Sequence, residues 1–157
     1  MIKQVFKWGC WIITIAIMVA IFCLSAQPAE ISQNTSNSFA YKVLSIFEEF
    51  QRLDESTQSK VVEEMQLYVR KAAHFSEYAC LSVFMYLSVL QTFKGKMLFV
   101  WSLAVCQLYA VSDEVHQYFV PGRSCEIRDM LIDGAGVISG ILAVLLIKII
   151  IFRKRQA

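Results

Sequence analysis

The feature that most constrains this chain is a run without any charged side chain, from Trp8 to Ala29. A helix that spans a membrane needs about 20 mostly apolar residues. The run therefore predicts a membrane-spanning helix, which we place at residues 7–27. A cleaved secretory signal is the alternative, because Lys3 and Lys7 precede the run. Its apolar core exceeds the ~7–15 residues of such signals, which favours a retained helix.

Three further apolar runs follow, at residues 72–93, 97–117 and 130–152, each with ionisable residues near one end. Only 18% of the residues are charged and 57% are apolar, whereas about a quarter of the residues in soluble domains are charged. We therefore predict an all-α membrane protein with four transmembrane helices in a single domain over residues 1–157. The net charge of +2, with no basic stripe or zinc-finger spacing, argues against nucleic acid as a partner.

Three groups of basic residues lie in the short flanks on one side of these four runs. The groups are Lys3 and Lys7, then Lys94 and Lys96, then Arg153, Lys154 and Arg155. Such residues mark the cytoplasmic side of a membrane protein. All 13 acidic residues fall in the remaining, outward-facing part of the chain. We therefore predict a multi-pass protein with both termini in the cytoplasm.

The segment between the first two runs has helical periodicity. Apolar residues at Phe39, Val43, Phe47 and Phe50 are three or four apart, which is typical of an amphipathic helix. Asp54 then precedes a second helix as its cap, and no helix-breaking residue separates that helix from the second apolar run. We expect these amphipathic outer helices to pack on the outer ends of the bundle or to lie in the headgroup layer.

Polar residues recur three or four apart at the outer ends of the last three runs, so each helix has one polar edge. They are Lys71, His74, Glu77 and Tyr78, then Asp113, Glu114, His116 and Gln117, then Asp129 and Asp133. At 1.5 Å per residue, His74, Asp113 and Asp133 lie roughly 28, 24 and 27 Å from the inner ends of their runs. This similar height predicts a polar pocket near the outer membrane boundary. Interhelical ion pairs at hydrated helix ends are the alternative interpretation.

The residue types in this cluster suit several chemistries. A histidine beside a carboxylate, as in His74 and Glu77, can act as general acid and base. Two imidazoles and several carboxylates could also hold a metal, although no His-Glu-x-x-His pattern occurs. Lys71, Arg123 and Arg128 could bind a phosphate or carboxylate. Gly136-x-x-x-Gly140 is typical of close packing between helices.

These motifs resemble the VanZ-like family of bacterial membrane proteins. The resemblance is carried by the segments 71–78, Lys-Ala-Ala-His-Phe-Ser-Glu-Tyr, and 112–123, Ser-Asp-Glu-Val-His-Gln-Tyr-Phe-Val-Pro-Gly-Arg, by residues 129–136, and by Ser25-Ala26-Gln27-Pro28. It implies a site made of these same motif residues. We assign His74, Glu77, Asp113, Glu114 and His116 as catalytic candidates, and Lys71, Tyr78, Gln117, Arg123, Asp129 and Asp133 as substrate-binding candidates.

The family is named for a protein that raises resistance to the glycopeptide teicoplanin, which implies a role at the cell envelope. We therefore expect a bacterial cell-membrane protein whose pocket acts on or binds an envelope component. Its expected partners are membrane lipids and a cell-wall precursor or lipid-linked ligand. A membrane-embedded enzyme that uses His and carboxylate groups, or a metal, is the alternative function.

Overall fold

The computed structural model describes residues 2–154, and within that range it contains helices and no strand. The helices are α1 (Ile2–Ser25), α2 (Ala29–Leu44), α3 (Glu48–Gln51), α4 (Glu55–Val89), α5 (Gly95–Tyr118) and α6 (Ile127–Lys154). The prediction of an all-α protein is confirmed. Of the basic residues that predict orientation, Arg155 and the side chains of Lys3 and Lys7 lie outside the described part.

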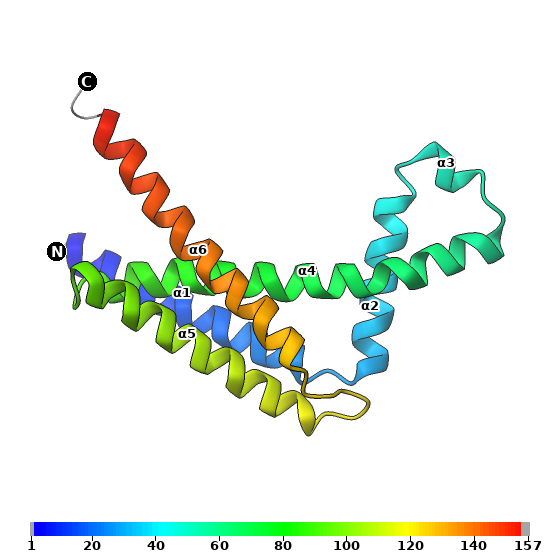
Figure 1. Cartoon of the computed structure of the whole chain (residues 1–157), viewed down its shortest axis with the longest axis horizontal. Helices are drawn as coiled ribbons and strands as arrows, with labels where there is room; N and C mark the ends of the chain where they lie inside the picture. Colours follow the sequence, from blue (N-terminus) through cyan, green and yellow to red (C-terminus); the bar gives the residue numbers. More distant parts are fainter. Residues whose placement is uncertain (1, 155–157) are drawn as a thin grey trace.

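Helices α1, α4, α5 and α6 form a bundle in which the chain direction alternates (Figure 1). The start of α1, the turn between α4 and α5, and the end of α6 lie toward one end, which we call the basic end because it carries Lys94, Lys96, Arg153 and Lys154. The link from α1 to α2 and the loop from α5 to α6 lie at the opposite end, which we call the site end.

Three stretches of the described chain have the length and hydropathy to cross a membrane. They are Trp8–Ser25, Gly95–Tyr118 and Ile127–Lys154. The expected crossing at residues 72–93 is not among them, so three helices, and not the four predicted, meet this criterion of length and hydropathy. Most of that segment lies inside α4, where His74, Glu77 and several serines lower the mean hydropathy. Of these polar side chains, His74, Ser82 and Ser88 are buried inside the protein. Because they do not face lipid, α4 can be less apolar than a helix that lipid surrounds.

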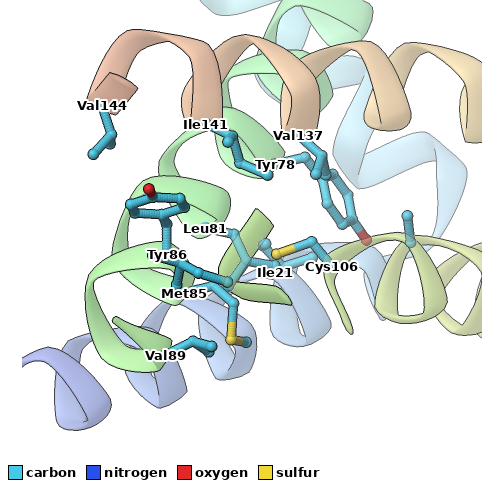
Figure 2. Close-up of a cluster of buried hydrophobic side chains, with 12 residues drawn as sticks. Ile21, Tyr78, Leu81, Met85, Tyr86, Val89, Cys106, Val137, Ile141 and Val144 are labelled. Carbon is cyan, nitrogen blue, oxygen red and sulfur yellow. The ribbon is translucent and has the colours of Figure 1, made fainter. Parts of the chain in front are cut away.

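The bundle core lies where α4 meets α1, α5 and α6 (Figure 2). Tyr78 and Leu81 of α4 are fully buried, as are Cys106 of α5 and Val137 of α6. Polar ties also join the helices, because the Tyr109 hydroxyl donates to the Met18 carbonyl oxygen at 2.6 Å. A single apolar core thus holds α4 in the centre of the bundle.

The predicted Gly136-x-x-x-Gly140 contact is present between α6 and α4. A Cβ atom at Gly136 would collide with the backbone carbonyl oxygen of Phe75, and one at Gly140 with the carbonyl oxygen of Ala79. Only glycine therefore permits this approach. It brings the first turns of α6 against the part of α4 that carries the site residues.

The outer segment folds beside the bundle as α2, α3 and the first half of α4 (Figure 1). Its small core contains Ala40, Phe50 and Val62. Phe39 and Phe47 are instead 57% and 55% exposed, so most of the predicted apolar stripe faces away from the protein. Small residues of α2 pack on α4, because they permit closer contact than the aromatic side chains do. The expected single amphipathic helix is also divided, since α2 ends at Leu44.

The predicted start of the following helix is confirmed. The Asp54 carboxylate accepts a hydrogen bond from the Thr57 backbone N–H at 3.0 Å, as a helix N-cap does. From there α4 continues without a break to Val89. The outer segment and the bundle are thus connected by one continuous helix.

Candidate functional site

A cavity of about 140 Å³ lies at the site end, between the bundle and α2. Three of the predicted site residues line it, namely His74, Glu77 and Arg123. The rest of its wall is formed by Leu24, Ser25, Gln27, Ser32, Thr35, Ser36, Arg70 and Ala73. We call this cavity the outer pocket. Its charged lining comprises two guanidinium groups, one carboxylate and one imidazole.

Arg123 ties the loop between α5 and α6 to the end of α1. Its Nε donates to the Gln27 carbonyl oxygen at 2.9 Å, and its Nη1 donates to Gln117 Oε1 at 3.0 Å. Burial lowers the pKa of the Arg123 guanidinium from its usual value, and the charge of Arg70 acts in the same direction. Gly122, with φ +75°, allows the turn that presents Arg123. Arg123 therefore acts as a structural tie as well as part of the pocket wall.

Asp113 is buried where α5 meets α1, next to the pocket-lining Ser25. Its Oδ2 accepts hydrogen bonds from Ser25 Oγ at 2.8 Å and from Gln117 Nε2 at 3.1 Å. Its other oxygen, Oδ1, is buried and has no hydrogen-bond partner among the described residues. The network thus runs from the pocket-lining Ser25 and Arg123 to a buried carboxylate.

A second polar group joins α4 to the first turns of α6. Lys71 pairs with Asp129, and His74 Nδ1 lies 3.7 Å from Asp133 Oδ1. Asp133 is completely buried, and neither of its carboxylate oxygens has a hydrogen-bond partner within residues 2–154. The Tyr78 hydroxyl is also buried and has no hydrogen-bond partner among these residues. His74 therefore connects the outer pocket with this buried group.

Two further catalytic candidates, like Asp113, lie outside the pocket wall. Glu114 is buried, and its Oε2 accepts the Glu126 backbone N–H at 3.0 Å just before α6 begins. His116 stacks on Phe22 of α1, with ring centroids 4.4 Å apart. The polar edges of α4, α5 and α6 thus meet at the site end, but the structure does not bring His116 into the outer pocket.

The arrangement favours binding or proton transfer by side chains. No group of three or more His, Cys, Asp or Glu side chains is placed to hold a metal ion in the part of the chain that is described. The pocket does combine an imidazole and a carboxylate with hydroxyl and guanidinium donors. Such a set can hold a small polar group and exchange a proton with it.

Several pocket residues were not among the predicted site residues. Ser32, Thr35 and Ser36 lie three or four residues apart on α2, and this spacing of hydroxyls was the available signal. Ser25 and Gln27 lie in the segment after the first apolar run that carries part of the family resemblance. Arg70 precedes the predicted Lys71 but faces the pocket, whereas Lys71 pairs with Asp129.

The apolar crossings and the buried polar residues at one end of the bundle define a helical membrane protein. The model of the VanZ/LLP1 family matches residues 10–150, which is nearly the whole chain. The chain therefore belongs to the VanZ/LLP1 family, and the resemblance identified from its sequence motifs is confirmed. No curated protein and no solved structure matches it.

Proposed function

We propose that this chain is a multi-pass protein of the bacterial cell membrane whose outer pocket binds, or acts on, a small polar part of a cell-envelope component. Through this site it contributes to tolerance of the glycopeptide teicoplanin. The single observation that carries the proposal is the outer pocket, in which His74, Glu77, Arg70 and Arg123 line one cavity at the end of the bundle. Ionisable residues at membrane depth are costly, so their gathering around a cavity favours a functional role.

The proposed topology has α4 as a fourth crossing, with both termini in the cytoplasm and the site end outside. The second half of α4 packs against α1, α5 and α6, and Tyr78, Leu81 and Met85 lie in the core. A helix enclosed by three others does not need an apolar surface all round, which accounts for its moderate hydropathy. The basic residues at the opposite end of the bundle support a cytoplasmic location for that end.

The outward-facing apolar residues of α2 and of the link between α2 and α3 fit the same orientation. Phe39, Val43, Ile46 and Phe47 are all at least 40% exposed. Large exposed apolar patches are unusual on proteins that water surrounds. We propose that these outer helices lie in the outer headgroup layer, with the hydroxyl face of α2 closing the outer pocket.

The size of the pocket bears on what it can bind. Pockets for drug-sized ligands usually measure about 300–1,000 Å³, and this cavity measures about 140 Å³. A glycopeptide antibiotic is larger than such ligands, so the proposed ligand is a small group of an envelope molecule. Tolerance would then arise through a change in the envelope, without capture of the antibiotic in this pocket.

An enzymatic function is the second candidate, and the position of His74 favours it. Its imidazole lines the outer pocket with Glu77, and its Nδ1 lies 3.7 Å from the buried Asp133. A carboxylate behind a histidine can orient the ring and stabilise its protonated form. In this version, His74 acts as general acid or base on a lipid-linked or cell-wall substrate.

Reporter fusions test the topology. Fusions after Lys96 and after Ala157 should report the cytoplasm, and a fusion after Glu55 should report the exterior. The pair at Glu55 and Lys96 isolates α4, because both reporters would lie on the same side if α4 did not cross. An external reporter at Ala157 would contradict the proposed orientation.

Pocket variants test the function in a glycopeptide-sensitive Gram-positive host. We expect Glu77→Gln and His74→Ala to return teicoplanin susceptibility to that of cells without the protein, while protein abundance stays within about twofold. Glu63→Gln is the matched control, since Glu63 is an exposed carboxylate on the same helix. Lipid and muropeptide profiles of the same cells identify the envelope component.

The outcomes separate the parts of the proposal. Full tolerance in both pocket variants at normal abundance would contradict an active outer pocket. The wild-type chain could confer no tolerance and still change the lipid or muropeptide profile in a Glu77-dependent way. That result would contradict the role in teicoplanin tolerance and support an active outer pocket. Low abundance of both pocket variants, with Glu63→Gln normal, would show that the cluster stabilises the fold.

A further inference from the structure

A second cavity lies at the basic end of the bundle, far from the outer pocket. It measures about 740 Å³ and runs between the end of α4, the start of α5 and the last part of α6. Its lining residues are Tyr86, Leu90, Lys94, Gly95, Lys96, Leu98, Phe99, Leu145 and Lys148. We call it the basic groove. Its size lies within the range typical of ligand pockets.

The charged groups of the basic groove are all of one sign. Lys94 and Lys96 flank Gly95, whose φ of +57° forms the turn between α4 and α5, and Lys148 approaches from α6. None of the three takes part in an ion pair within the described residues. The nearest acidic residue on α6 is Asp133, 15 residues before Lys148 and so roughly 22 Å away along the helix axis. Three lysines therefore share a groove without any neighbouring carboxylate.

The remaining wall of the basic groove is apolar. Leu90, Phe99 and Leu145 line it, and Lys148 lies over the Tyr86 ring, with its Nζ 5.9 Å from the ring centroid. The apolar surface continues along α6 past Ile149 and Phe152 into an adjoining hollow. Lysines above a continuous apolar surface match the two parts of an anionic phospholipid, its phosphate headgroup and its acyl chains.

We propose that the basic groove binds one anionic phospholipid of the membrane. The headgroup phosphate lies among Lys94, Lys96 and Lys148, and an acyl chain follows the apolar side of α6. A soluble anion would use the lysines alone and leave the apolar wall unfilled. The lipid would also fill the space between the diverging ends of α4 and α6 (Figure 1). This proposal does not depend on what the outer pocket binds.

Native mass spectrometry of the full chain in detergent tests the proposal, with phosphatidylglycerol and phosphatidylcholine as probes. We expect phosphatidylglycerol to bind with at least tenfold higher affinity. Each lysine near an anionic headgroup contributes about fivefold in affinity. The variant Lys94→Gln/Lys96→Gln/Lys148→Gln should therefore bind phosphatidylglycerol about 100-fold more weakly. All three side chains are exposed, so their replacement should leave the fold intact.

A matched triple variant controls for net charge. Lys42→Gln/Arg52→Gln/Lys60→Gln removes the same charge from exposed positions outside the basic groove, and it should change the affinity by less than about threefold. An equal loss of phosphatidylglycerol affinity in both triple variants would overturn the assignment of the site, because the affinity would then depend only on net charge. Equal binding of the two lipids would also overturn it. Displacement of phosphatidylglycerol by soluble glycerol phosphate would show a simple anion site and overturn the lipid assignment.

Discussion

Alanine substitution at the α4–α6 contact should destabilise the protein. The size of the effect should depend on which atoms the added methyl group contacts. At Gly136, the added Cβ would collide with the Phe75 carbonyl oxygen, which belongs to the backbone of α4 and cannot rotate away. Relieving such overpacking typically costs about 1–3 kcal/mol. Alanine in place of a helical glycine gains roughly 0.5–1 kcal/mol in compensation. We therefore expect Gly136→Ala to lower the free energy of unfolding by about 0–2.5 kcal/mol, with a central value of roughly 1 kcal/mol.

Other glycines supply graded controls. At Gly134, the added Cβ would meet the end of the flexible Gln107 side chain at 2.8 Å, so Gly134→Ala should cost less than Gly136→Ala. Gly9 has no atom within 4 Å of an added Cβ, so Gly9→Ala should be neutral or raise stability by roughly 0.5–1 kcal/mol. The expected order of stability is Gly9→Ala, then Gly134→Ala, then Gly136→Ala.

The measurement is reversible unfolding of the purified protein in mixed micelles, followed by far-ultraviolet circular dichroism as the fraction of denaturing detergent rises. Equal stability of Gly136→Ala and Gly9→Ala would refute the close approach of α6 to α4. A Gly136→Ala variant that is destabilised but keeps its function in cells would show that the site tolerates a shift of α6. The glycine contact would then matter for folding alone.

Three further predictions concern single groups. Hydrogen bonds from Ser56 and Thr57 lower the pKa of Asp54 to about 2. The contribution of Asp54 to the free energy of unfolding should therefore be complete above the unfolded pKa of about 3.8 and be lost as the pH falls toward 2. Asp54→Ala should remove that part of the pH dependence of unfolding. Lys71→Met should cost about 3–5 kcal/mol by leaving Asp129 unpaired, and Lys71→Met/Asp129→Leu should restore most of it in a double-mutant cycle. His116→Ala should retain far more tolerance than Glu77→Gln, since His116 stacks on Phe22 outside the pocket.

Features with a local cause could be predicted from the sequence. The cap at Asp54 needs only a side-chain oxygen before a helix, and the turn at Gly122 needs only a residue that accepts positive φ. The contact at Gly136 and Gly140 follows from two small residues one turn apart. Each of these signals lies within a few residues, so no knowledge of the tertiary structure was required.

The neighbours toward which the side chains of each helix point could not be predicted in the same way. His116 and Gln117 lie three and four residues after Asp113, and both spacings permit a shared helix face. In the structure, Gln117 bonds to Asp113 while His116 turns to Phe22. Counting residues gives the height of a side chain along its helix but not the neighbour that it meets. The pocket wall from α2 was missed for the same reason.

For α2, an interpretation of helical periodicity that holds for soluble proteins was wrong. An apolar stripe such as Phe39 and Phe47 normally marks the face of a helix that packs on a core. Here those side chains are exposed, and α2 packs through Ser36 and Ala40. Small residues allow close contact between helices, and the proposed position of α2 in the headgroup layer would accommodate the large apolar ones. The periodicity was therefore informative about the helix but not about which side faces the protein.

The buried carboxylates of the site end are difficult to explain by stability alone. Asp133 has two oxygens without a hydrogen-bond partner among the described residues, and Asp113 and Glu114 have one each. Apolar residues of similar volume in place of a buried ionic group are often neutral or stabilising. A bundle selected only for packing would thus have little reason to keep three such acids on two neighbouring helices. Their position at the same end of the bundle as the cavity lined by His74 and Glu77 supports the functional role proposed for that end.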